Sequence, residues 1–399
     1  MKVRSIQTGD AWLDVGDDSG GTTPDAGATE ARRVLSSAVR SQNLAVLAGL
    51  GTSLCVVKGG TRLAPTMQDL MNKARERFAE LDKQEQVIEG FHWSDFEKLS
   101  NVPKDCQDLE YFMSRATVAV GFLAADAAKR IEGYLAVAEE VIRNAVDFMK
   151  DDVELAVHES FLRRVARRSS RRSRTKLFTT NYDLCFEIAA RRSGFVVIDG
   201  FAFGNDARFD SAQFSYDVVR RSVTEERSDY IENLFHLHKL HGSVDWERQA
   251  GSSFILKKPG TRKPLLIYPR SDKYELAFSQ PYIEMMGVFQ SFVRVPSTTL
   301  LVIGFGFNDK HIAEPILAAA RGNLGLDIVI VSPDVEAASG DGRNPYLGEL
   351  LKLIEGGDGR ISLIAAKFEE IIRLIPDVVS ETELERHNQR LRNLGKPNA

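Results

Sequence analysis

Cysteine is scarce in this chain of 399 residues, which contains only Cys55, Cys106 and Cys185. The three lie far apart and form no Cys-x-x-Cys pair, which excludes a disulfide framework and a four-thiolate zinc site and fits a reducing cytosol. Long apolar runs are also missing, because no segment approaches the roughly 18 residues that a membrane span requires. The first residues contain no apolar stretch typical of a secretion signal. The sequence therefore predicts a soluble, cytoplasmic protein that does not enter a membrane.

A surplus of charge of one sign is missing as well. Charged residues make up 27% of the chain and the net charge is −4, so overall charge gives no argument for binding nucleic acid. The one dense basic segment runs from Arg163 to Lys176. It predicts either a contact with nucleic acid, phosphate or an acidic partner, or a solvated helix end whose cations face the C-terminal helix dipole. Both interpretations stay open at this stage.

Two short apolar segments each run into a Gly-x-Gly turn. Leu44–Ala48 is followed by Gly49, Gly51, Thr52 and Ser53, and 298–303 is followed by Gly304, Gly306, Asn308 and Asp309. A buried parallel strand that enters such a turn is typical of a phosphate-binding site, in which backbone amides donate to the ligand. An ordinary glycine-rich turn explains the first of the two equally well. No Gly-Lys-Ser/Thr follows, which argues against an ATPase P-loop.

Polar residues also follow two other predicted strands. Lys176–Thr179 precedes Asn181, Tyr182 and Asp183, and Leu326–Val331 precedes Ser332. In an open α/β sheet, ligands bind outside the carboxyl ends of the strands, so these side chains are expected in that crevice. Asn181 or Asp183 could instead cap the helix that begins near residue 184, and both roles are compatible.

A fifth strand end presents a histidine. The segment Phe235–Leu240 leads to His241, which is followed at once by Gly242 and Ser243. With an ordinary pKa of about 6.5, histidine is the side chain best suited to accept a proton at neutral pH. The alternative is a histidine whose ring is satisfied in the core or at the surface. The other polar strand ends favour a ring that faces a ligand.

Between residues 61 and 175 the apolar pattern is helical, with Thr66 and Asp69 forming a capping-box variant at the start of one helix. The sequence predicts an α/β, Rossmann-like fold with a mostly parallel sheet and a large helical insertion. Four regions follow: a flexible N-terminal arm with one short strand (1–28), the sheet domain (29–60 plus 176–376), the helical insertion (61–175) and a charged C-terminal tail (377–399).

Taken in order, four of these motifs resemble those of sirtuin-like NAD-binding domains: Gly49–Ser53, Thr180–Asp183, Lys239–Ser243 and Gly304–Asp309. The resemblance covers roughly residues 40–60 and 175–335. It is greatest to bacterial sirtuin-like effectors of anti-phage defence, including those paired with a HerA-type ATPase. This resemblance implies a sirtuin-type Rossmann fold that binds NAD, a homo-oligomer and a HerA-type ATPase as partner.

The resemblance also implies a role for each matched residue. Asn181 would hold the nicotinamide ribose and a water, His241 would be the general base, and the two would form the catalytic pair. The remaining cofactor-binding residues would be Gly49, Gly51, Thr52 and Ser53 at the pyrophosphate, Tyr182 and Asp183 beside the nicotinamide, and Gly304, Gly306, Asn308, Asp309 and Ser332 toward the adenosine half.

Sirtuin deacylases also carry four zinc-binding cysteines, and this chain has no such set. We therefore expect no zinc or other metal, and we expect hydrolysis of NAD+ to nicotinamide and ADP-ribose in place of deacylation. An effector that depletes NAD+ in this way has to be regulated, by oligomerisation or by the ATPase. The alternatives are a protein deacylase or ADP-ribosyl transferase, and a non-catalytic NAD or ADP-ribose sensor that serves as an assembly module.

Overall fold

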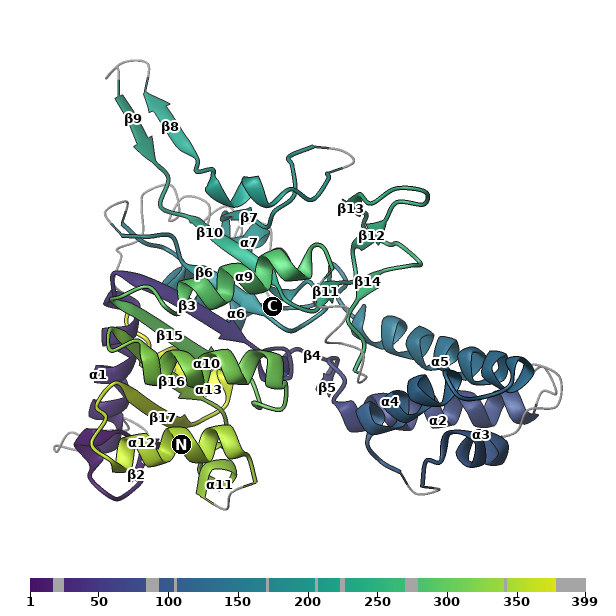
Figure 1. Ribbon diagram of the computed structural model, residues 1–399. Coiled ribbons are helices and arrows are strands. Elements are labelled where there is room, and N and C mark those ends of the chain that lie inside the picture. The colour runs from purple at the N-terminus through teal and green to yellow at the C-terminus, as the bar shows by residue number, and fades with distance from the viewer. Residues whose placement is uncertain are drawn as a thin grey trace.

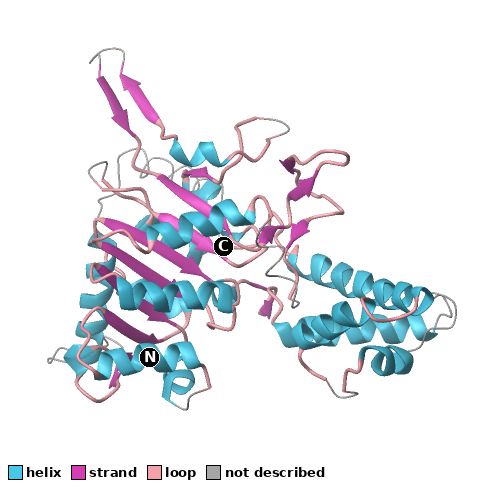
Figure 2. Ribbon diagram, in the orientation of Figure 1, coloured by secondary structure: helices cyan, strands magenta, loops and turns pink. Residues whose placement is uncertain are grey.

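The chain forms a mixed α/β fold built on one large sheet (Figures 1 and 2), and the predicted Rossmann-like class is confirmed. The computed structural model describes residues 1–16, 25–83, 93–103, 106–169, 172–204, 207–222, 227–269, 279–340 and 343–377. The nine strands of the sheet are, in spatial order, β2 (Leu13–Asp14), β1 (Lys2–Arg4), β17 (Ile361–Ala365), β16 (Leu326–Val331), β15 (Thr298–Ile303), β3 (Asn43–Ala48), β6 (Lys176–Thr179), β10 (Leu234–Lys239) and β7 (Val196–Ile198).

The strands from β17 to β7 all run parallel. The chain begins this parallel part at β3, adds β6, β7 and β10 on one side, and then returns to add β15, β16 and β17 on the other. The direction of growth therefore reverses between β3 and β15. In doubly wound sheets such a switch point leaves a crevice at the carboxyl ends of the strands, where ligands bind.

The first residues of the chain belong to the sheet, in contrast to the expected flexible arm. Strand β1 pairs antiparallel with β17, with Val3 opposite Ile364, and β2 pairs with β1. Val3 is fully buried and Val15 nearly so. These strands cover the edge of β17, which would otherwise present unpaired backbone groups. Residues 17–24 of the expected arm, and residues 378–399 of the expected C-terminal tail, lie outside the described residues.

Helices cover both faces of the sheet, as Figure 1 shows. Strand β3 is apolar from Leu44 to Ala48 because both of its faces are buried. Leu44 and Val46 point into one core, and Ala45 and Leu47 point into the other. The helices of the first core are α1 (Ala26–Arg40), α6 (Ala156–Val165), α7 (Cys185–Ser193) and α13 (Phe368–Ile371). Those of the second are α9 (Tyr282–Phe292), α10 (Lys310–Gly322), α11 (Val335–Gly340) and α12 (Pro345–Glu355).

A separate helical bundle lies beside the sheet and has a core of its own (Figure 1). Its helices are α2 (Met67–Lys83), α3 (Trp93–Ser100), α4 (Leu109–Val120) and α5 (Ala125–Val146). The predicted capping box is confirmed, since Thr66 Oγ1 accepts from the Asp69 amide and Asp69 Oδ2 accepts from the Thr66 amide. Helix α6, which the sequence analysis assigned to the insertion, packs against α7 and the sheet instead.

Several short paired strands complete the structure. The pair β4 (Val57–Lys58) and β5 (Thr61–Arg62) stands between the sheet and the bundle in Figure 1. The other pairs are β8 (Val219–Ser222) with β9 (Arg227–Tyr230), β11 (Gly242–Ser243) with β14 (Leu265–Leu266), and β12 (Trp246–Arg248) with β13 (Ile255–Lys257). Among the described helices, none combines the length and the apolar character needed to cross a membrane.

The basic segment begins within α6 (Ala156–Val165), and its described arginines are buried or half-buried. Arg167 and Arg168 are 3% and 4% exposed. The Arg168 guanidinium donates to the Ser41 carbonyl, and burial lowers its pKa to about 10. Arg174 forms an ion pair with Asp217 at 2.8 Å. Both sequence-based interpretations assumed cations in solvent, whereas Arg168 and Arg174 are bonded to other parts of the chain. A contact with nucleic acid here stays an untested prediction.

Candidate functional site

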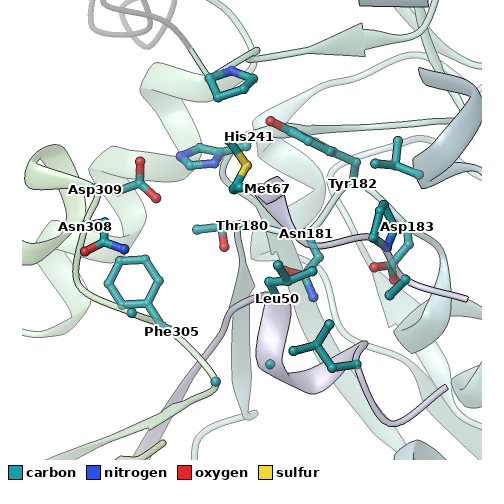
Figure 3. A pocket seen from close by; sticks show the side chains of 18 of the residues that line it. Leu50, Met67, Thr180, Asn181, Tyr182, Asp183, His241, Phe305, Asn308 and Asp309 are labelled. Carbon is teal, nitrogen blue, oxygen red and sulfur yellow. The ribbon is translucent and has the colours of Figure 1, made fainter. Parts of the chain in front are cut away.

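A pocket of about 410 Å³ lies at the carboxyl ends of the parallel strands (Figure 3). We call it the strand-end pocket. Five consecutive strands of the sheet contribute to its lining, which matches the crevice expected at the switch point. The contributing residues include Leu50 and Gly51 after β3, Thr180, Asn181, Tyr182 and Asp183 after β6, His241 after β10, Gly304, Phe305, Gly306, Asn308 and Asp309 after β15, and Ser332, Pro333 and Asp334 after β16.

The helical bundle forms another wall of the strand-end pocket. Met67 and Leu70 of α2, Glu110 of α4 and Val146 of α5 all line it. A pocket with a mostly apolar lining and a few convergent polar groups is the usual form of a small-molecule site. The insertion is therefore part of the site, and it encloses strand ends that would otherwise open to solvent.

Most of the predicted site residues meet in this pocket. Those that line it are Gly51, Asn181, Tyr182, Asp183, His241, Gly304, Gly306, Asn308, Asp309 and Ser332. Gly49, Thr52 and Ser53 do not line it, and the side chains of Thr52 and Ser53 are buried behind its wall. The structure thus brings the predicted set together in two tiers, one facing the cavity and one supporting it.

The glycines of the two turns allow the turns to pack against each other. The Gly51 amide donates to the Gly304 carbonyl at 2.9 Å. A Cβ atom on Gly51 would lie 2.5 Å from the Gly304 Cα, and one on Gly304 would lie 2.6 Å from the Gly51 Cα. Gly304 also has a φ of +62°, which L side chains rarely adopt. Glycine is needed here because two backbones touch, a reason that the sequence pattern alone does not reveal.

Asn181 is tied to the first turn by its amide nitrogen. Its Nδ2 lies 3.0 Å from the Gly49 carbonyl oxygen, 3.2 Å from Thr52 Oγ1 and 2.9 Å from Ser53 Oγ. Ser53 Oγ in turn donates to Asp183 Oδ2 at 2.7 Å. We call Gly49, Thr52, Ser53, Asn181 and Asp183 the asparagine side of the pocket. These bonds fix the orientation of the amide, so its Oδ1 is the atom that can accept from a ligand hydroxyl or a water.

Asp183 has the capping role that the sequence left open. Its Oδ1 accepts from the amide of Cys185, the first residue of α7, at 3.0 Å, while Oδ2 is held by Ser53. The carboxylate is nearly buried, with 7% exposed, although the residue still contributes to the pocket lining. Both oxygens are therefore engaged within the protein, and Asp183 contributes mainly by holding the loop of Asn181.

A buried lysine supports the same loop from below. Lys239, at the end of β10, is 2% exposed, and its Nζ donates to the carbonyls of Tyr182 and Asp183 and to Glu187 Oε1 at 2.8 Å. Burial raises the pKa of Glu187, and the attraction of Lys239 opposes this rise. Tyr182 is anchored at its other end, where its hydroxyl donates to the Ile267 carbonyl at 2.5 Å. The polypeptide that carries Asn181 is thus fixed at several points.

The opposite side of the pocket is built differently. His241 lies in the turn between β10 and β11, and its Nε2 is 2.9 Å from Nε2 of His311 on α10. Asp309, which precedes α10, lies close enough that one ligand atom from each of the three residues falls within 4.8 Å of the others. We call His241, Asp309 and His311 the histidine side. Figure 3 shows His241 and Asp309 next to each other across the cavity from Asp183.

Gly242 explains how His241 reaches this position. Its φ is +90°, and a Cβ atom there would lie 2.1 Å from the Leu265 carbonyl oxygen. The pairing of β11 with β14 therefore requires glycine directly after the histidine. The amide of Ile267 donates to the His241 carbonyl at 2.8 Å, which fixes the backbone of the turn and directs the ring into the pocket.

Sequence reasoning missed two residues that the structure places in this site. His311 stands two positions after the predicted Asp309, and Lys239 stands two positions before His241. The signal for Lys239 was a charged residue at the last position of a strand that is buried along its whole length, β10. The signal for His311 was weaker, because a polar residue in the first turn of a helix is common and nothing in the sequence relates its position to β10.

The chain was predicted to resemble sirtuin-like domains, and a family comparison supports this in part. No curated protein matches the chain. Residues 175–343 match the family model described as the SIR2-like domain. The matched region contains Asn181, His241, Gly304 and His311, whereas the first glycine turn lies before it. A SIR2-like domain supports an NAD-related function and NAD-dependent enzymatic activity in general terms. Residues 175–343 are thus similar to the SIR2-like domain, and this region carries the two side chains predicted to be catalytic.

Proposed function

We propose that the strand-end pocket binds NAD+ and hydrolyses it to nicotinamide and ADP-ribose. The observation that carries this proposal is the placement of His241 and Asn181: they come from two different strand ends, and both line one pocket. The SIR2-like match over the same region supports NAD as the ligand.

The proposed chemistry is the replacement of nicotinamide by water at C1′ of the ribose. The C1′–N bond breaks, its electron pair leaves with nicotinamide, and the ring nitrogen loses its positive charge. The leaving group therefore needs no acid. Water attacks the oxocarbenium-like carbon and gives up one proton, so that NAD+ and water yield nicotinamide, ADP-ribose and a proton.

The two polar sides of the pocket match the two tasks in this reaction. Asn181 is held by its Nδ2 and presents Oδ1 to a water or a ribose hydroxyl. His241 accepts the proton that the water releases or one from a ribose hydroxyl, and positioned general-base catalysis contributes about 100- to 10,000-fold. Gly51 and Gly304, whose amides are already bonded within the protein, let phosphates approach the backbone closely beside Gly306, and Asn308, Asp309 and Ser332 offer polar groups for the adenosine half.

The proposal is tested by incubating the purified chain with NAD+ and separating the products. We expect nicotinamide and ADP-ribose in equal amounts, and a loss of about 100-fold or more in Asn181→Ala, because misplacing a reacting group costs this much. Asn72→Ala is the matched control, since Asn72 is exposed on α2. Transfer of ADP-ribose to an added acylated peptide, without free ADP-ribose, would favour the transferase alternative. Removal of the acyl group from that peptide, again without free ADP-ribose, would favour the deacylase alternative. Binding of NAD+ without turnover would favour the sensor.

The cellular role that we propose is an anti-phage defence effector that depletes NAD+. This part rests on the sequence resemblance, as do the proposed homo-oligomer and HerA-type ATPase partner. An unregulated enzyme of this kind would consume the NAD+ of its own cell. The expected result is that NAD+ falls in infected cells that carry the wild-type chain and stays constant with Asn181→Ala; equal NAD+ in both would contradict the defence role.

A further inference from the structure

His241, Asp309 and His311 form the one group of metal-ligating side chains found among the described residues. Two imidazoles and a carboxylate are a set that transition metals bind, and zinc sites with three protein ligands and one open position use combinations of this kind. The set differs from the four-cysteine module of sirtuin deacylases in its ligands and in its place. It lies at the strand-end pocket, in the turn after β10 and at the start of α10.

The geometry of the two histidines fits a shared cation. Their Nε2 atoms are 2.9 Å apart, and two nitrogen ligands of one Zn²⁺ lie about 3 to 3.5 Å apart when each is about 2.0–2.1 Å from the metal. The largest separation within the group is at most 4.8 Å, so closure by about 1 to 1.5 Å would bring all three ligands to one ion.

We propose that His241, Asp309 and His311 bind a divalent transition-metal ion of the Zn²⁺ class, and that the bound ion blocks NAD+ cleavage. The blocking half of this proposal rests on the proposed function, and the binding half does not. A metal takes up the Nε2 lone pair of each ring, so the hydrogen now between the two rings moves to an Nδ1 atom or leaves to solvent. With its Nε2 lone pair in a metal bond, His241 cannot accept the proton from water.

The surroundings of the group favour binding at this place. His241 is 7% exposed and its backbone is fixed by the pairing of β11 with β14. His311 sits in the first turn of α10, and Asp309 adds a negative charge that offsets the charge of the ion. The ligands thus come from two rigid elements, and the pocket provides the open side for a fourth ligand such as water.

Direct binding is the first test, with Zn²⁺ as the probe and the full chain stripped of metal by a chelator. Calorimetry is expected to show one Zn²⁺ per wild-type chain. His311→Ala is expected to weaken the affinity by about 100-fold or more, because the loss of even an outer-shell partner of a metal site costs about 10- to 100-fold. Glu314→Ala is the matched control, since Glu314 is exposed on the same helix one turn later.

The second test is NAD+ cleavage with and without saturating Zn²⁺. Inhibition of wild type and of Glu314→Ala, with His311→Ala resistant at the same Zn²⁺ concentration, is the expected result. Absence of binding to wild type, or equal binding by His311→Ala, would overturn the metal site. Undiminished cleavage by the zinc-bound wild type would overturn the blocking role. If no form of the chain cleaves NAD+ but wild type binds Zn²⁺ through His311, the metal site stands and the proposed function fails.

Discussion

The two polar sides of the strand-end pocket differ in how their side chains are held. On the asparagine side, hydroxyl, amide and carboxylate groups bond to one another and to the backbone, so that Asn181 has one orientation. On the histidine side, His241 contacts a second titratable ring on another element. The comparison indicates that one side is built to position a ligand and the other is built to exchange a proton or a cation. The motifs that suggested a single site thus contain residues fixed by hydrogen bonds and residues that can exchange a proton or a cation.

The rigidity of the asparagine side is tested most strongly at Lys239. Lys239→Met removes the ammonium that holds the Tyr182 and Asp183 carbonyls and leaves the Glu187 carboxylate buried without its cation. Breaking a buried ion pair in this way costs about 3–5 kcal/mol. The free energy of unfolding in urea measures the loss. Adding Glu187→Gln should recover part of it; an unchanged stability of Lys239→Met would contradict the supporting role.

The two glycine turns pack against each other and connect the asparagine side of the pocket with the histidine side. Gly304→Ala combines a positive φ with a Cβ atom 2.6 Å from the Gly51 Cα, so we expect a loss of about 2–4 kcal/mol. Gly306→Ala is the matched control, because its Cβ atom would meet only the Asn308 side-chain amide, at 3.3 Å. It should change the stability by less than about 1 kcal/mol. Equal thermal denaturation of the two variants would show that the turns do not pack as described.

The histidine side can be compared with a histidine of the core. His158 is fully buried between Phe186 and Phe368, and among the described residues neither of its ring nitrogens has a hydrogen-bond partner. Burial lowers its pKa to about 4. Its contribution to stability is therefore complete above pH 6.5, where the unfolded histidine is also neutral, and is lost as the pH falls from about 6.5 toward about 4.

Replacing His158 isolates its contribution to the pH dependence of the free energy of unfolding. Between pH 7.5 and pH 5 the wild type should lose about 2 kcal/mol through His158, and His158→Leu should show a decline that is smaller by this amount. Urea unfolding at both pH values provides the measurement. His236, whose pKa burial lowers to about 3, remains in both proteins and gives the common background. An identical pH dependence would mean that His158 is not buried as a neutral ring.

The smallest expected effect concerns the hydroxyl behind Asn181. Ser53→Ala removes the group that donates to Asp183 and accepts from Asn181. Leaving such buried groups without a partner costs about 1–2 kcal/mol. The KM for NAD+ and kcat should worsen together, because the amide is less well fixed, while Ser253→Ala in an exposed turn should match the wild type. A variant with lowered stability and unchanged kinetics would restrict Ser53 to a structural role.

The sequence allowed much of the sheet to be predicted, because strands buried on both faces are mostly apolar. Strand β16 has the predicted bounds, Leu326–Val331. One short strand was expected in the N-terminal arm, where β2 lies, but β1 was not foreseen, because Lys2–Arg4 is short, partly polar and stabilised by an edge that only the folded sheet provides. For the same reason α6 was assigned to the insertion: its apolar stripe does not reveal which core receives it.

The sequence predicted which strand ends form the candidate site. It did not predict which side chains and turns contact each other within the site. Gly49 and Gly51 were assigned to a ligand, whereas their Cβ positions are filled by the backbone of the second turn. The pairing of His241 with His311 depends on α10 crossing near the end of β10, which a polar residue in a helix start does not indicate. Local patterns identify which positions face a crevice, while contacts between distant elements decide what each side chain does there.

The most direct test of the account compares nicotinamide release from NAD+ by metal-free wild type and by His241→Ala. NAD+ binding and thermal denaturation are measured on the same samples. We expect release by wild type and a loss of about 100- to 10,000-fold in the variant, with NAD+ binding and folding retained. Equal release by both proteins would contradict the central claim that His241 accepts the proton in this pocket.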